Sequence, residues 1–442
     1  MWTWGDWDGR QQRDAYLFVC WNARDAVHIN AEPRDRNRTQ TVRHATRGPR
    51  EGEQKPYRAR STPHRTLFTP RSCICATAPI LADLARGDLN SLRALLSGRR
   101  TRGTSLAAQL DARHDTENQD TLLTLAARHG QAEAVRLLLE GGASIGATNG
   151  GGASALYIAC QEGQIECARL LLDGGAAADQ ADSEGATPLY IACQEGHVEC
   201  VRLLLEASAA SNQADEEGTT PLYIACEKGN LECVRLLLEA GAAVDQADDE
   251  GTTPLSAASL TGEISCARLL LEAGAAVNQA DAEGRTPMLV ACQEGQIAIA
   301  RLLLEASAAT DQASDDGATP LYIACQNGHL ECVRLLLEAG AAINQAEGDG
   351  ITPLSAACIY GHAECARLLL RSSAAINQAS NSGATPLLMT CAAGLVEIVR
   401  LLLEAGAAID QTNNSGVTPL LVSCVSGRLE ILEAEHVFLP PN

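Results

Sequence analysis

The sequence predicts an all-α solenoid built from stacked helix-turn-helix units. Two observations carry this prediction. The first is a Thr-Pro pair that recurs every 33 residues from Thr187 to Thr418. The second is that each unit holds two short apolar segments with helical spacing, separated by polar turns. A unit this short cannot bury its own apolar face, so successive copies must stack and share one continuous core.

The register of the repeat also predicts the domains. Stepping back from Thr187 by the same interval reaches Ser154 and Thr121, where other residues replace the proline. The predicted domains are a basic, largely disordered tail over residues 1–78, an N-terminal capping repeat and polar insertion over 79–120, nine repeats over 121–417, and a partial C-terminal repeat over 418–442.

The first helix of a unit is predicted at about residues 188–195. Thr187 is suited to cap it, and Pro188 suits its first position because proline lacks an N–H that the helix would leave unpaired. Gly196 is expected to end it in the left-handed conformation.

The second helix is predicted at about residues 198–207, where apolar side chains recur at spacings of three and four. The polar stretch that follows, SNQADEEGT, ends with Gly218 before the next Thr-Pro pair. Its composition predicts a turn that projects from the stack.

At this point the unit resembles the ankyrin repeat, whose pattern includes TPLHLAA, then GH, then LLL. The resemblance recurs over nine units and implies a protein-binding module. Its partners would contact the projecting turns and the exposed side of the first helices, which together line a concave face. Two departures stand out. Tyrosine or serine replaces the family's histidine at Tyr157, Tyr190, Tyr223, Tyr322, Ser256 and Ser355, and serine replaces a helix-ending glycine at Ser208, Ser307 and Ser373.

Charge divides the chain into two parts. The whole chain carries a formal net charge of −21, yet residues 1–78 are net basic and hold all four tryptophans. A tail of this kind is expected to be unstructured. Two alternatives stay open, namely binding to nucleic acid or another acidic surface, and docking onto the acidic repeats.

No apolar run approaches the ~20 residues that a membrane-spanning helix needs. Residues 1–21 also lack the pattern of a secretory signal, because acidic residues interrupt them. We therefore expect a cytoplasmic or nuclear protein with no membrane contact.

Most of the 17 cysteines fall at two fixed positions of the repeat. Equivalent thiols of neighbouring repeats are expected one helix-packing distance apart, ~8–10 Å, too far for a disulfide. The spacing also lacks the paired form of zinc sites. We expect buried, reduced thiols and no metal.

Nothing in the sequence indicates catalysis. The histidines His197, His329 and His362 share one turn position, and no Ser/His/Asp set or phosphate-binding glycine loop occurs. The glycine-rich residues 149–152 lie in a projecting turn. We expect a protein that is not an enzyme, with no catalytic residues and no cofactor.

The family resemblance places the predicted partner-binding residues on the turns and first helices. They are Asp215, Glu216, Glu217, Asp248, Asp249 and Glu250 in the turns, and Gln194, Glu195, Glu227, Leu260, Gln293, Glu294, Gln326, Ile359 and Tyr360 on the helices.

The turn carboxylates are expected to be solvated, and two interpretations of them stay open. They either keep a self-similar array soluble or form a track for a basic or extended protein segment. Nucleic acid would be repelled by such a track. Leu260, Ile359 and Tyr360 are the expected apolar anchors. The function predicted is a monomeric, non-enzymatic scaffold or adaptor; the alternative is the substrate-recognition subunit of a larger complex such as a ubiquitin ligase.

Overall fold

The structure, a computed structural model, describes residues 80–97, 106–114, 118–428 and 430–431. The predicted tail, residues 1–78, lies outside the described residues. The described part contains helices and one isolated β-bridge, between Thr148 and Ser154, which confirms the all-α prediction.

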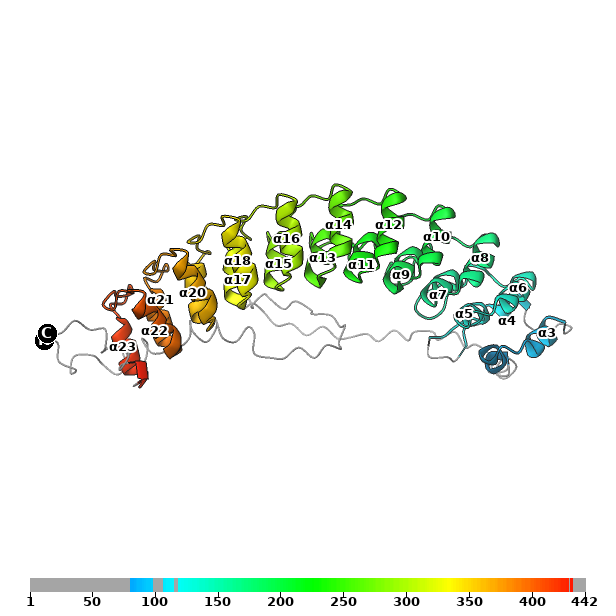
Figure 1. Ribbon diagram of the computed structural model, residues 1–442. Coiled ribbons are helices and arrows are strands. Elements are labelled where there is room, and N and C mark those ends of the chain that lie inside the picture. Colours follow the sequence, from blue (N-terminus) through cyan, green and yellow to red (C-terminus); the bar gives the residue numbers. More distant parts are fainter. Residues whose placement is uncertain (1–79, 98–105, 115–117, 429, 432–442) are drawn as a thin grey trace, which may run out of the picture. The chain divides into compact units, whose positions relative to one another are not determined.

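The helices form two layers in which neighbouring helices of the same layer pack side by side in chain order (Figure 1). The first-helix layer comprises α5 (Leu122–Arg128), α7 (Ala155–Gln161), α9 (Pro188–Glu195), α11 (Pro221–Glu227), α13 (Pro254–Thr261), α15 (Pro287–Gln293), α17 (Pro320–Asn327), α19 (Pro353–Ile359), α21 (Pro386–Ala393) and α23 (Pro419–Val425).

The second-helix layer comprises α6 (Ala132–Glu140), α8 (Ile165–Asp173), α10 (Val198–Glu206), α12 (Leu231–Glu239), α14 (Ile264–Glu272), α16 (Ile297–Glu305), α18 (Leu330–Glu338), α20 (Ala363–Arg371) and α22 (Val396–Glu404). Each second helix packs on the first helix of its own repeat, and one continuous apolar core runs between the layers.

The first helices begin and end as the sequence predicts. In α9 the Thr187 hydroxyl oxygen accepts from the backbone N–H of Tyr190 at 3.1 Å, and Pro188 is the first helical residue. Gly196 ends the helix with φ of 73°, in the left-handed region that glycine reaches at little steric cost. These local interactions fix where the helix begins and ends.

The second helices begin without a side-chain cap and end before a left-handed residue. That residue is serine rather than glycine at Ser208, Ser307 and Ser373, where φ is 62°, 66° and 68°. A side chain in this region costs roughly 1–2 kcal/mol. The fold accommodates the three serines, as expected, because at the equivalent Gly241 an added Cβ would have no neighbour within 4 Å.

Side chains in the loop after each second helix fix the spacing of the repeats. The Asn212 side-chain oxygen accepts from the backbone N–H of Ala243 at 2.8 Å, and Asp245 does the same for Ala276 at 2.9 Å. Asn and Asp both occur at this position because both supply the same acceptor oxygen. These bonds cross from one repeat to the next, so they set the register of the stack.

The N-terminal end of the described structure continues the stack. Residues 80–86 are helical, α3 spans Asn90–Ser97, and Leu84 and Leu92 are fully buried. The short helix α4 (Leu106–Leu110) falls in the predicted polar insertion and also buries Leu110. Beyond it, the Asn118 carbonyl accepts from Gly150 N–H at 2.9 Å, a contact that later turns repeat. Part of the predicted insertion therefore replaces the usual turn of a repeat.

Candidate protein-interaction surface

In the turns that begin with aspartate, that carboxylate holds the turn closed. The Asp215 Oδ1 atom accepts from the backbone N–H groups of Glu217 at 3.0 Å and Thr219 at 2.8 Å. Asp248 makes the same two bonds, at 3.0 Å to Glu250 and 2.8 Å to Thr252. A carboxylate with two backbone donors is a strong, charge-assisted arrangement.

The expectation that all six acidic turn residues are solvated is wrong for Asp215 and Asp248. Both are half-buried and serve as acceptors inside the turn, whereas Glu216, Glu217 and their counterparts in the next turn are exposed. The reason is geometric: in these two turns it is the first residue that points back toward the backbone N–H groups that the turn leaves unpaired. A neutral replacement of Asp215 or Asp248 must therefore keep an acceptor oxygen.

Backbone hydrogen bonds join each turn to the next. Glu216 donates its N–H to the Glu184 carbonyl at 3.0 Å, and Asp249 donates to the Glu217 carbonyl at 3.0 Å. The chain of contacts continues with Ala282 donating to Glu250 at 2.8 Å. We call the exposed tip residues Glu184, Glu216, Glu217, Asp249, Glu250 and Glu283 the acidic ridge. Its backbone is held in place before any partner arrives.

Tyrosines occupy the position that is histidine in the TPLH pattern, and they connect the first helices to the turns. Burial, followed by the charge of the facing aspartate, raises the pKa of each tyrosine above its ordinary value, and each hydroxyl bonds that aspartate. The pairs are Tyr157 with Asp182, Tyr190 with Asp215, and Tyr223 with Asp248. The aspartate that closes a turn is thus also tied to the helix that precedes it.

Where serine occupies the same position, the side chain stays within its own helix cap. The Ser256 hydroxyl lies 3.3 Å from the Thr253 hydroxyl, and the Ser355 hydroxyl lies 3.1 Å from the Thr352 hydroxyl. Serine is too short to reach the following turn, so it reinforces the cap in place of a link to that turn.

Most of the predicted polar residues on the first helices bond a neighbour in the chain. Gln194 donates to Glu195 at 2.9 Å, and Gln293 donates to Glu294 at 3.1 Å. Glu227 forms an ion pair of 3.2 Å with Lys228. These contacts are near the surface and contribute little to stability, so the groups are available to a partner.

The predicted apolar anchors differ from one another. Leu260 is 45% exposed, whereas most leucines of this layer are buried. Ile359 and Tyr360 are only half-buried, and the Tyr360 hydroxyl accepts from the Gln326 side chain at 3.0 Å. The structure therefore brings Gln326 and Tyr360 together across two repeats and leaves Leu260 by itself.

The turn histidines connect repeats. The Nε2 atom of His197 lies 3.1 Å from the Gln161 carbonyl, and His329 and His362 make the equivalent contacts at 2.9 Å with Gln293 and 3.0 Å with Gln326. Each histidine thereby occupies a carbonyl that the end of the preceding first helix leaves unpaired. This role is structural.

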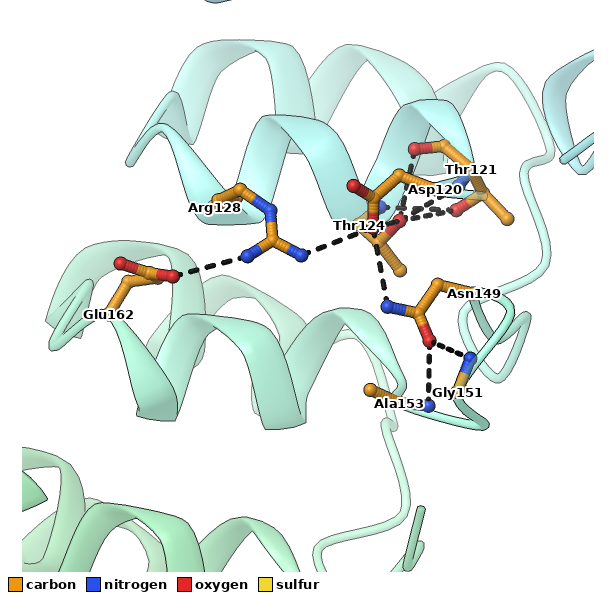
Figure 2. A network of polar contacts seen from close by, with 8 residues as sticks. All are labelled: Asp120, Thr121, Thr124, Arg128, Asn149, Gly151, Ala153 and Glu162. Atoms are coloured by element: carbon orange, nitrogen blue, oxygen red, sulfur yellow. Dashed lines mark hydrogen bonds and ion pairs between the residues drawn. The ribbon is translucent and has the colours of Figure 1, made fainter. Parts of the chain in front are cut away.

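One polar network near the N-terminal end was not predicted. Asp120 is only 3% exposed and accepts from Thr124 at 3.2 Å, Arg128 at 3.3 Å and Asn149 at 3.4 Å. Arg128 also pairs with Glu162 of the next repeat at 3.2 Å, as Figure 2 shows. The available signal was that Asp120 and Arg128 are the sole carboxylate and the sole arginine at their repeat positions.

The repeat cysteines are free, and all but Cys424 are buried. The thiols that the structure brings together occupy different repeat positions in adjacent repeats, not the same position. Cys160 bonds Cys200, and this hydrogen bond, followed by burial, holds the pKa of the Cys160 thiol well above its usual range. Burial first and then a bond to Cys233 have the same effect on the pKa of Cys193.

The described residues also show whether they offer a metal site or a membrane-spanning helix. In those ranges, no three His, Cys, Asp or Glu side chains gather in a way that could hold a metal ion. None of the helices there has the length and apolar character needed to cross a membrane.

Comparison with protein families assigns the repeat. A family model described as ankyrin repeats, three copies, matches residues 81–182, 174–248, 240–313, 306–380 and 372–434. A search of curated proteins returns no match to this chain. The chain belongs to the ankyrin repeat family, whose members are generally protein–protein interaction modules and typically not enzymes.

Proposed function

We propose that this ankyrin repeat protein is a monomeric, non-enzymatic adaptor that binds a basic or extended protein segment along the acidic ridge and the adjoining first helices. The observation that carries the proposal is the hydrogen-bonded series of turns, which displays exposed carboxylates on a backbone that is already ordered. A partner that binds there does not have to order the turns, so less of the interaction energy is lost.

Charge supports a basic partner. The ridge places Glu216, Glu217, Asp249 and Glu250 on two adjacent turns, with no lysine or arginine in those turns. Such a concentration of one sign attracts an oppositely charged segment at long range and speeds encounter. The same field repels the phosphates of nucleic acid.

An apolar contact supplies the second part of the proposed surface. Leu260 is exposed at the end of α13, in the layer that adjoins the turns. Burying such a side chain against a partner contributes roughly 1.5–3 kcal/mol. We propose Leu260 as the main anchor. Tyr360 contributes less because its hydroxyl is already bonded to Gln326.

The thiols support an intracellular location. The repeat cysteines are free and mostly buried, and cysteines persist in this form in the reducing cytoplasm and nucleus. We propose that the protein acts in one of these compartments.

The test first isolates a partner protein by affinity capture on the full chain. It then measures the association and dissociation rates of that partner with the unaltered chain and its variants. The ridge variant combines Glu216→Gln, Glu217→Gln, Asp249→Asn and Glu250→Gln and keeps Asp215 and Asp248. We expect its association rate to fall about tenfold at low salt and its salt dependence to flatten. Leu260→Ala should instead raise the dissociation rate.

The matched control removes the same number of charges from the ends of the second helices, through Glu206→Gln, Glu239→Gln, Glu272→Gln and Glu338→Gln. All four of these side chains are exposed. If the control slows association as much as the ridge variant, only net charge matters and the proposed track is wrong.

A further inference from the structure

The second helices carry an arginine at the same exposed position in all nine described repeats. These arginines are Arg136, Arg169, Arg202, Arg235, Arg268, Arg301, Arg334, Arg367 and Arg400. In six repeats the arginine forms an ion pair with a glutamate three residues earlier, at 3.3–4.0 Å. The pairs neutralise the surface of this layer locally.

Two adjacent repeats lack that glutamate. Ser265 stands three residues before Arg268 on α14, and Ala298 stands three residues before Arg301 on α16. Both arginines are exposed, and in the described part of the chain neither forms an ion pair or hydrogen bond. Two guanidinium groups with ten N–H donors between them therefore face solvent side by side.

A hollow lies between the two helices. It has a volume of about 320 Å³ and is lined by Ile264, Arg268, Ile297, Ala298, Arg301, Leu302 and Glu305. Ile264 is 39% exposed, so the rim is apolar as well as basic. A surface that joins exposed isoleucine with arginine is typical of protein-binding sites.

The chain contains a matched hollow three repeats later. It lies between α20 and α22, has a volume of about 430 Å³, and uses Arg367, Val396, Arg400 and Leu401 at the equivalent helix positions. There, however, carboxylates also line the hollow, at Glu397, Glu404 and Glu430, and Arg367 is paired with Glu364 at 3.3 Å. The two hollows thus share a backbone setting but differ in charge.

We propose that the α14–α16 hollow binds an acidic segment of a second protein partner. A carboxylate of that segment accepts from Arg268 and Arg301, and an adjacent apolar side chain packs between Ile264 and Ile297. Arginine suits this role because its planar group bonds a carboxylate through two N–H donors. The single Glu305 at the edge leaves the hollow net positive.

The chemistry of the hollow favours an acidic protein segment over a nucleic acid. A polyanion would contact the arginines but would leave Ile264 and Ile297 without an apolar partner. A short acidic and apolar segment meets both requirements of the hollow. This site lies on the opposite layer from the acidic ridge and attracts the opposite charge.

The test measures fluorescence anisotropy of a short labelled peptide of alternating leucine and glutamate with the full chain. A peptide of leucine and glutamine is the control for charge. We expect the glutamate peptide to bind at least about tenfold more tightly, as two charge-assisted contacts imply. Equal binding of the two peptides would show that the arginines do not select an acid, and the proposal would fail.

Two double variants and one control variant locate the site. The double variant Arg268→Gln, Arg301→Gln should lower the affinity for the glutamate peptide about tenfold or more. The control Arg334→Gln, Arg367→Gln makes the same charge change at paired arginines and should alter that affinity less than about twofold. Ser265→Glu with Ala298→Glu restores the missing partners and should also weaken binding about tenfold.

The restoring variant changes exposed residues in the first turn of each helix, where glutamate is favourable, so its unfolding temperature should not fall. If it folds and still binds the glutamate peptide as well as the unaltered chain does, the proposed site is wrong. Stronger binding of single-stranded polyuridylate than of the peptide would also overturn the choice of an acidic protein segment.

Discussion

The two layers of the array come from the same 33-residue unit but depend on different interactions. In the first-helix layer, threonine caps and turn carboxylates bond nearby backbone groups, and the backbone of each turn bonds the turn of the next repeat. In the second-helix layer, helices start without a side-chain cap and present exposed arginine and glutamate pairs. The first layer is therefore sensitive to substitution, while the charge of the second can vary without disturbing the fold.

That difference explains where binding properties can diverge between repeats. Serine and alanine in place of glutamate at Ser265 and Ala298 change an exposed ion-pair position, so they leave the stack intact and make the adjoining hollow basic. A comparable change at Asp215 would release two backbone N–H groups and a tyrosine hydroxyl. Substitutions that create a new binding specificity therefore reduce stability less on the second helices than in the turns.

The largest effect is expected from a glycine of the first layer. Gly218 has φ of 80°, and an added Cβ would lie 2.7 Å from the backbone nitrogen of Asp249. Gly218→Ala should lower the free energy of unfolding by about 3 kcal/mol, because backbone strain adds to a clash that breaks the contact between turns. Urea unfolding measures the loss.

Gly241→Ala is the control, since Gly241 has almost the same φ, 79°, but open space around the added Cβ. It should cost about 1 kcal/mol, the conformational part alone. Equal losses for the two variants would mean that the contact between turns adds nothing to the stability of the first layer.

A smaller, pH-dependent effect is expected from thiols between the layers. Burial, followed by the charge of Glu263, raises the pKa of Cys266 from 9.0 to about 11. The folded thiol thus keeps its proton where the unfolded thiol loses it, so the stabilisation is complete below pH 9 and is lost as the pH rises to about 11. Each pH unit in that window should remove roughly 1.4 kcal/mol.

Cys266→Ala tests this origin because it removes the titrating group. The free energy of unfolding of the variant, measured by urea denaturation between pH 8 and 11, should fall less steeply than that of the unaltered chain. Its constant loss from the smaller side chain does not affect the slope. Identical slopes would assign the alkaline loss to other groups.

The smallest effect is expected in the second layer. Glu232 pairs with Arg235 at 3.3 Å, and both side chains are about half exposed. Glu232→Gln should change the free energy of unfolding by less than about 0.5 kcal/mol, because solvent and salt screen an exposed pair. A loss above about 1 kcal/mol, persisting at high salt, would contradict the division between a sensitive and a tolerant layer.

Sequence reasoning predicted the helices accurately but missed several contacts between repeats. Residues 188–195 were predicted as a helix and form α9, because the signals for its start and end lie within a few residues of each other. The bonds of Tyr190 to Asp215 and of Cys160 to Cys200 were not predicted. These partners lie in different repeats, and their approach depends on how the repeats stack.

The candidate surface was likewise predicted only in part from the sequence. Family resemblance placed the candidate residues on the turns and first helices, but it treated the six acidic turn residues as equivalent. The structure separates Asp215 and Asp248, which close the turns, from Glu216, Glu217, Asp249 and Glu250. The distinction depends on which carboxylate faces the unpaired N–H groups of a folded turn.

By itself the sequence determined the repeat unit, the helix boundaries and the left-handed positions, because capping, proline geometry and glycine conformation act over a few neighbouring residues. Only the tertiary structure decided which thiols meet, which carboxylates are already bonded, and that Arg268 and Arg301 line one hollow without paired glutamates. Those features require side chains from adjacent repeats to be brought within contact distance, and stacking of the two layers is what brings them there.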